Sequence, residues 1–89
     1  MKILVVGDGG RESAIVKKIS DSPSITELYI APGNGGTSKY ATNINVKSND
    51  IESLLNFAIN NNIDLTIVGP EIPLSMGIVD LFEKNNLNI

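Results

Sequence analysis

The sequence predicts a three-layer α/β/α domain built around a mostly parallel sheet of about four strands. Short apolar runs rich in β-branched residues recur along the chain, and helical patterns fill the intervals between them. This alternation is typical of a parallel sheet that is covered by helices on both faces. Because 89 residues are enough for one domain at most, residues 1–89 are expected to form a single unit.

Four apolar runs are the expected strands. A short, unbroken apolar run indicates a parallel strand that is buried on both faces. Three runs are strong, at 2–6, 26–31 and 65–68, and a weaker one lies at 44–46. Residues 85–88 are expected to form a turn and Ile89 to begin a further strand, which indicates a chain cut at a domain edge. A natural C-terminus with a frayed tail is the alternative.

Three helices are expected between and after these strands, at 11–20, 51–59 and about 74–84. Asp50 is a good N-cap for the second of them, which has the clearest helical periodicity in the chain. The side chains expected to face the core are Ala14, Ile15 and Ile19 in the first helix, Ile51, Leu54, Leu55, Ala58 and Ile59 in the second, and Leu74, Ile78, Val79 and Phe82 in the third.

Composition excludes several classes of function. The net charge is −3, and no basic stripe or aromatic ladder is present, so nucleic-acid binding is not expected. The absence of cysteine excludes disulfides and thiolate chemistry, and the absence of histidine removes the usual general base and metal ligand. No segment has the pattern of a secretory signal or the length of a membrane span, so a cytoplasmic protein without membrane contact is expected.

The loops that follow the expected strands carry the functional signal. Ligands of open parallel sheets bind outside the carboxyl ends of the strands. The first such loop, residues 7–12, holds three glycines and then opens a helix, an arrangement that can hold an anion on backbone N–H groups. Arg11, the one arginine of the chain, is unfavourable in the first turn of a helix unless an anion is fixed there. The alternative is a solvated Arg11 paired with Glu12 or Asp8.

Two further loops are expected at the same edge. The second loop, residues 32–38, has glycines for close backbone approach and hydrogen-bonding groups on Asn34, Thr37 and Ser38. In the third loop, residues 69–71, Glu71 could accept hydrogen bonds from an amine or a hydroxyl. The alternatives are a tight strand exit without a ligand for the second loop and a solvated carboxylate or helix cap for the third.

The first loop is not a dinucleotide fingerprint. The pattern G-x-G-x-x-G needs a glycine at position 12, where the chain has Glu12, and the acid expected at the end of the second strand is missing. A G-x-x-x-x-G-K-[ST] phosphate loop is also absent. The loops therefore suit the phosphate of a smaller sugar phosphate, with Arg11 as a bidentate clamp and the glycine amides as its cradle.

Three segments together resemble a known family. The runs KILVVGDGGRES, YIAPGNGGT and DLTIVGPEIPLSMGIVD are similar, in order and spacing, to the N-terminal domain of the phosphoribosylamine–glycine ligases, which are ATP-grasp enzymes of purine biosynthesis. The resemblance spans 1–89 and implies a Rossmann-like, pre-ATP-grasp domain. It implies a ligase that joins glycine to 5-phosphoribosylamine with hydrolysis of ATP to ADP, through an acyl phosphate of glycine.

The resemblance also assigns roles residue by residue. ATP and Mg²⁺ or Mn²⁺ would be bound by ATP-grasp and C-terminal domains outside residues 1–89, so the fragment alone is expected to be inactive, with no catalytic residue or metal ligand of its own. Ser13 stands where the family usually has histidine, and Asp8 where it commonly has asparagine or serine. The substrate-binding residues implied are Gly9, Gly10, Arg11 and Glu12 in the first loop, Pro32, Gly33, Asn34 and Gly36 in the second, and Gly69 and Glu71 in the third, beside a matching Pro70.

Two other interpretations remain open from the sequence. One is a stand-alone binding module for a phosphorylated metabolite. The other is a structural interaction domain whose loops bind nothing.

Overall fold

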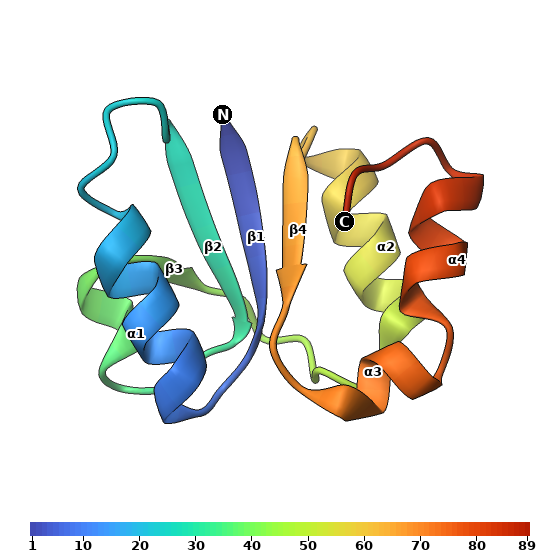
Figure 1. Ribbon diagram of the computed structural model, residues 1–89, viewed down its shortest axis with the longest axis horizontal. Coiled ribbons are helices and arrows are strands. Elements are labelled where there is room, and N and C mark those ends of the chain that lie inside the picture. Colours follow the sequence, from blue (N-terminus) through green and yellow to red (C-terminus); the bar gives the residue numbers. More distant parts are fainter.

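The computed structural model describes residues 1–89 and shows one all-parallel sheet between two layers of helices (Figure 1). The four strands lie in the order β3-β2-β1-β4, so β1 is central. The three-layer prediction is confirmed. The elements are β1 (Lys2–Gly7), α1 (Gly10–Ile19), β2 (Glu27–Pro32), a 3₁₀ turn η1 (Thr37–Lys39), β3 (Thr42–Asn43), α2 (Ile51–Asn60), β4 (Leu65–Val68), α3 (Glu71–Ser75) and α4 (Ile78–Lys84).

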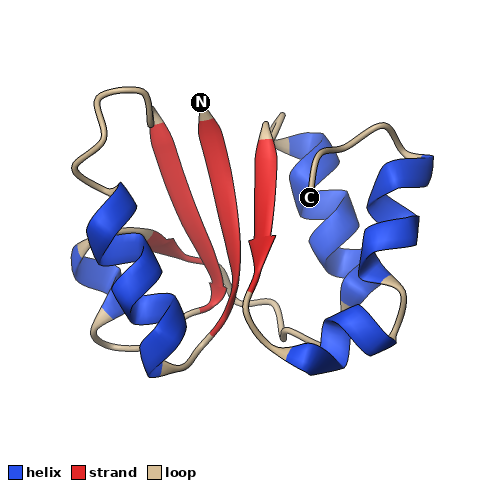
Figure 2. Ribbon diagram, in the orientation of Figure 1, coloured by secondary structure: helices blue, strands red, loops and turns tan.

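Each face of the sheet has its own apolar core, because successive side chains of a strand point to opposite faces. On one face Ile3, Val5 and Ile30 pack with Val16 of α1. On the other face a larger cluster packs the sheet against α2 and α4. Figure 2 shows the helices on the two sides of the sheet. Its buried members are Leu4, Val6, Ala31, Leu54, Leu55, Ala58, Ile63, Ile78 and Phe82.

The strong strand predictions are confirmed, and the weak one is wrong. The short strand β3 comprises Thr42 and Asn43 instead of residues 44–46. Ile44 N still donates to Ile30 O at 2.8 Å, but Val46 N then turns back to Ile44 O at 2.8 Å. This tight turn ends the pairing, although the apolar side chains of Ile44 and Val46 still pack against the larger core.

The expected third helix is two helices. Its first part, α3, begins earlier than expected, at Glu71. The helical conformation is interrupted at Gly77, which has a φ of +90°. A left-handed residue cannot continue a right-handed helix, so α4 starts anew at Ile78. As a result Leu74 is 45% exposed instead of facing the core, whereas Ile78 and Phe82 are buried as expected.

The helix faces differ in detail from the prediction. In α1, Ala14 is exposed and Val16 is buried, because the stripe that faces the sheet begins at Glu12 and continues one turn later. In α2, Ile59 is 46% exposed while its neighbours Leu54, Leu55 and Ala58 fill the core. The N-cap prediction is confirmed: Asp50 Oδ1 accepts a hydrogen bond from Ser53 N at 3.2 Å.

Residues 87–89 form no strand in residues 1–89, although Ile89 was expected to begin one. One backbone hydrogen bond, from Thr66 N to Asn88 O at 3.1 Å, lays this segment beside β4. None of the helices has the length and apolar character that crossing a bilayer requires.

Candidate functional site

The three glycine-bearing loops meet at one edge of the sheet, as predicted. They follow β1, β2 and β4, which are neighbours and all parallel, so their carboxyl ends lie together. Backbone hydrogen bonds join the loops: Gly33 N donates to Gly7 O at 3.0 Å, and Gly69 N donates to Val6 O at 3.1 Å. This edge is therefore a single surface formed by three separate segments.

The topology makes the ends of β1 and β4 a switch point. The chain leaves β1 toward α1 on one face of the sheet and leaves β4 toward α3 on the other face (Figure 1). Such divergent connections are where open α/β sheets bind their ligands. The first and third loops flank this point, so it is the centre of the candidate site.

Glu12 occupies the space between these two loops. It lies in the first turn of α1 and is only 5% exposed, which is unusual for a carboxylate. A Cβ built onto Gly7 would lie 2.2 Å from Glu12 Oε1, and one built onto Gly69 would lie 2.6 Å from Glu12 Cδ. A side chain at either position would have to displace the Glu12 side chain, which fills that space. Gly7 also has a φ of +141°, a conformation that L side chains rarely adopt.

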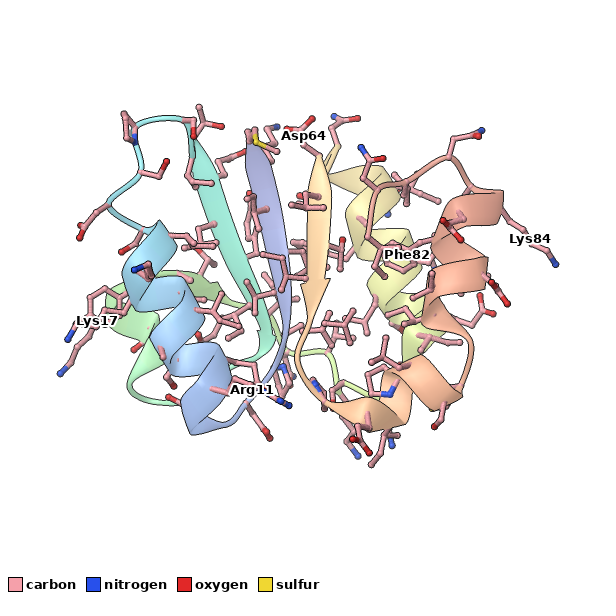
Figure 3. All side chains as sticks on the ribbon, viewed as in Figure 1. Arg11, Lys17, Asp64, Phe82 and Lys84 are labelled. Atoms are coloured by element: carbon pink, nitrogen blue, oxygen red, sulfur yellow. The ribbon has the colours of Figure 1, made fainter.

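The carboxylate of Glu12 supplies a negative charge to the N-terminal turn of α1. Arg11 Nε lies 3.8 Å from Glu12 Oε2, so the pairing of Arg11 with Glu12 is present. Arg11 Nη2 also donates to the carbonyl oxygen of Gly69, at 2.5 Å. The guanidinium thus spans from the first loop to the third, while the Arg11 side chain remains 69% exposed at this edge (Figure 3). Its other N–H groups are free to receive an anion.

The second loop is organised by the side-chain amide of Asn34. Its Nδ2 donates to Asp8 O at 2.8 Å and to Ser13 Oγ at 3.0 Å. Its Oδ1 accepts from Gly36 N at 2.8 Å and from Thr37 N at 3.0 Å. The amide therefore ties the second loop to the first loop and to α1, and Ser13 is part of that tie.

The hydroxyl of Thr37 is used inside the second loop. Thr37 is completely buried, and Asn34 N donates to its hydroxyl at 2.8 Å. The hydroxyl lies 2.8 Å from Asn43 Oδ1, and Asn43 Nδ2 donates to Asn34 O at 2.9 Å. A Cβ on Gly33, whose φ is +72°, would lie within 2.7 Å of both of these side-chain oxygens. The sequence signal for this arrangement is the asparagine followed three residues later by a hydroxyl.

The remaining candidate residues are exposed, except for the half-buried Pro32. Gly9 is the N-cap of α1 and Gly10 its first residue, and a Cβ on Gly10 would meet no atom within 4 Å. Pro32 ends β2, and Gly36 is the N-cap of the η1 turn. Glu71 is the first residue of α3 and is exposed, without a hydrogen bond or ion pair.

Neither a metal cluster nor the largest hollow coincides with this edge. No group of three His, Cys, Asp or Glu side chains is placed to hold a metal ion. A surface hollow of about 470 Å³ lies beside β2 and β3, lined by Thr26, Leu28, Tyr40 and neighbouring residues, and Ser38 at the end of the second loop is its one member from the three loops. The loop edge has no deep pocket within residues 1–89, so a ligand there would contact a second surface or stay partly solvated.

Fold and loops together define an α/β domain with glycine-rich loops at the switch point of a parallel sheet. Residues 1–89 match the family model described as phosphoribosylglycinamide synthetase, N domain. The chain therefore belongs to this family, as the three sequence motifs indicated.

Curated relatives agree with this assignment. The chain is 54% identical over 89 residues to a phosphoribosylamine–glycine ligase of Caldanaerobacter subterraneus and 51% identical to one of Clostridium acetobutylicum. It is 48% identical over 91 aligned positions to one of Escherichia coli. In each case the whole chain is covered, but it spans only 21% of the relative's length. This similarity favours the N-terminal part of a ligase over a stand-alone binding module.

Proposed function

We propose that this chain is the substrate-side domain of an enzyme that joins glycine to 5-phosphoribosylamine in purine biosynthesis, with hydrolysis of ATP to ADP. The observation that carries the proposal is the convergence of the three motif loops at one edge of the sheet, where Glu12 fills the space between the first and third loops at the switch point. The family membership supplies the reaction. A cytoplasmic location belongs to the same proposal.

The first loop would bind the phosphate of the sugar substrate. The free N–H groups of Arg11 face solvent beside the exposed glycines Gly9 and Gly10, which open α1. A phosphate there would gain charge-assisted hydrogen bonds and the favourable end of the helix dipole. The second loop, with Pro32, Gly33 and Gly36, would form the wall on the other side of the substrate. The buried Glu12 would hold the loops apart at the spacing that this substrate requires.

The third loop would face the reacting end of the substrate. Glu71 is the one candidate carboxylate that is both exposed and unpaired, so it would accept a hydrogen bond from the amine or from a ribose hydroxyl. Gly69 and Pro70 would set the position of this carboxylate relative to Arg11, because Gly69 O accepts a hydrogen bond from the guanidinium.

The bond-forming chemistry would take place against domains outside residues 1–89. A carboxylate oxygen of glycine would attack the terminal phosphorus of ATP, and ADP would leave. The amine of phosphoribosylamine would then attack the acyl phosphate, releasing inorganic phosphate and one proton as the amide forms. ATP and Mg²⁺ or Mn²⁺ would be bound by those domains, and this chain would position the attacking amine.

A chimera tests the proposal. Residues 1–89 would replace the matched segment of the Caldanaerobacter ligase, and the product of glycine and phosphoribosylamine would be assayed with ATP. The chimera is expected to be active. Arg11→Ala in it should raise KM for phosphoribosylamine about ten- to hundredfold, because hydrogen bonds to a charged group contribute about 1.5–3 kcal/mol.

The matched control is Lys17→Ala, which removes an exposed cation from the far end of the same helix. It should leave KM unchanged. An inactive chimera that is nevertheless folded would contradict the proposed function. An Arg11→Ala chimera with the parent's KM would contradict the phosphate clamp.

A further inference from the structure

The Asn34 side chain has no hydrogen-bonding capacity left for a ligand. Both Nδ2 protons are donated, to Asp8 O and Ser13 Oγ. Oδ1 accepts two hydrogen bonds from backbone N–H groups of its own loop. An amide offers two donors and one oxygen with two lone pairs, so all four positions are in use. The Asn34 side chain therefore links the second loop to the first, and any chemical change to its amide would affect this link.

Asn34 is followed by Gly35, and this is the single Asn-Gly pair in the sequence. A glycine successor exposes the preceding asparagine to deamidation because no side chain hinders its backbone nitrogen. Gly35 is exposed, its N–H makes no hydrogen bond, and a Cβ there would meet no atom within 4 Å. The nucleophile for deamidation is thus unhindered in the folded chain.

The reaction itself needs only water. Gly35 N attacks Asn34 Cγ, a new C–N bond closes a succinimide ring, and the Cγ–Nδ2 bond breaks to release ammonia, which carries away the proton of the attacking nitrogen. Water then opens the ring at either carbonyl and leaves aspartate or isoaspartate. The electrophilic carbon and the leaving nitrogen both belong to the amide that the four hydrogen bonds immobilise.

We propose that Asn34–Gly35 is a deamidation site which the folded loops protect, and that loss of the Asn34 amide releases the second loop from the first. Aspartate at position 34 replaces the donor Nδ2 by a carboxylate oxygen that faces Asp8 O, so an attractive contact becomes a repulsive one. Isoaspartate also inserts a methylene into the backbone just before the η1 turn. Either product breaks the link between the loops and leaves the sheet and its two cores intact.

Peptide mapping by mass spectrometry tests the protection. The 89-residue chain is incubated in mildly alkaline buffer, folded and in urea, and deamidation at Asn34 is followed with time. The rate in the folded chain is expected to be lower by about tenfold or more, because the hydrogen bonds must open together before the ring can close. Equal rates in both states would overturn the proposal.

Ser13→Ala tests the link between the two loops, because it removes one acceptor of Asn34 Nδ2 and leaves the core untouched. It should accelerate deamidation at Asn34 in the folded chain severalfold. Ser20→Ala is its control: that hydroxyl also lies on the α1 segment but donates to Lys17 O, away from the loops. Equal acceleration by both substitutions, or by neither, would overturn the role of the Ser13 contact.

The consequence for the loops is tested with Asn34→Asp, which has the composition of the deamidated product. Amide NMR spectra should show shifts in residues 8–13 of the first loop and α1 as well as in residues 33–37, with β1 and β4 unchanged. Shifts confined to the immediate neighbours of position 34 would show that the loops stay joined, which contradicts the second half of the proposal.

Discussion

At the scale of single residues, the site depends on one buried carboxylate and two glycines. Glu12 fills the space beside Gly7 and Gly69, so a side chain at either position would have to displace it, and the positive φ of Gly7 disfavours a side chain there as well. The sequence indicated that Glu12 and the glycines belong to one site. It could not show that the carboxylate is 5% exposed, because that burial depends on how closely the third loop approaches α1.

Gly7→Ala should destabilise the chain by about 2–4 kcal/mol. The new Cβ combines an unfavourable positive φ with a clash against Glu12. Urea unfolding measures this free energy. Gly10→Ala is the matched control, since a Cβ there meets nothing and alanine favours a helix, so its stability should stay equal or rise by up to about 1 kcal/mol. Equal loss in both variants would contradict the steric account.

The loop residues also show what residue types alone cannot predict. Thr37 and Asn34 were expected to offer hydrogen bonds to a ligand, and the structure shows both side chains bonded within the second loop or to its neighbours, while substrate binding at Asn34 stays a prediction. A polar residue type shows that a side chain can form hydrogen bonds. Which group it bonds to depends on the backbone turn around it. Arg11 as the phosphate clamp stays a prediction, with its contact to Gly69 O now part of its geometry.

At the scale of elements, the strongest local signals were predicted best. The Asp50 cap and the apolar periodicity of α2 depend on residues close in sequence, and both are confirmed. The third helix was predicted as one because its apolar pattern continues across Gly77. Backbone conformation at that glycine, not hydrophobicity, divides α3 from α4.

Removal of the α2 cap has a defined cost. Asp50→Ala should lower the free energy of unfolding by about 0.5–2 kcal/mol, because Ser53 N loses its acceptor at the helix N-terminus. Asn49→Ala, one residue earlier and exposed without a hydrogen bond, should be near neutral. Chemical denaturation of both variants provides the comparison, and an Asp50→Ala chain as stable as the Asn49→Ala chain would refute the capping role.

The ion pair at the amino ends of the strands predicts a pH dependence. Lys2 Nζ lies 3.1 Å from Glu27 Oε2, and its hydrogen bond is the main cause that lowers the pKa of Glu27. A lowered pKa in the folded state means that the pair stabilises the chain above the unfolded pKa of Glu27 and stops doing so as the pH falls through the folded pKa.

Glu27→Gln should therefore be less stable than the parent at neutral pH and equal to it in acid. Thermal unfolding at several pH values measures the difference. Because both side chains are more than a third exposed, the effect should be small and should weaken in high salt. A difference that stays constant down to strongly acidic pH would show that the pair is not its source.

At the scale of the whole molecule, the position of the site follows from topology. Parallel strands bring three loops that are distant in sequence to one edge, and the order β3-β2-β1-β4 makes the ends of β1 and β4 the switch point. The meeting of the loops at one edge was predictable from the alternation of strands and helices, whereas the strand order that creates the switch point was not. The hollow beside β2 and β3 could not be predicted from the sequence, since it depends on how short β3 is.

The two cores are what hold this edge in place. Phe82 of α4 points inward to the larger cluster, in which it is fully buried (Figure 3). The smaller cluster fixes α1 through Val16, one turn after Glu12, so the packing of the sheet sets the position of the buried carboxylate.

An amide NMR titration of residues 1–89 with ribose 5-phosphate tests the central claim most directly. Shifts should gather on Gly7–Glu12 and Gly33–Ser38, with ribose alone producing none of them and Arg11→Ala greatly reducing them. Shifts that fall outside these loops, that persist unchanged in Arg11→Ala, or that fail to occur in either loop would contradict the claim that this edge of the sheet holds the sugar phosphate.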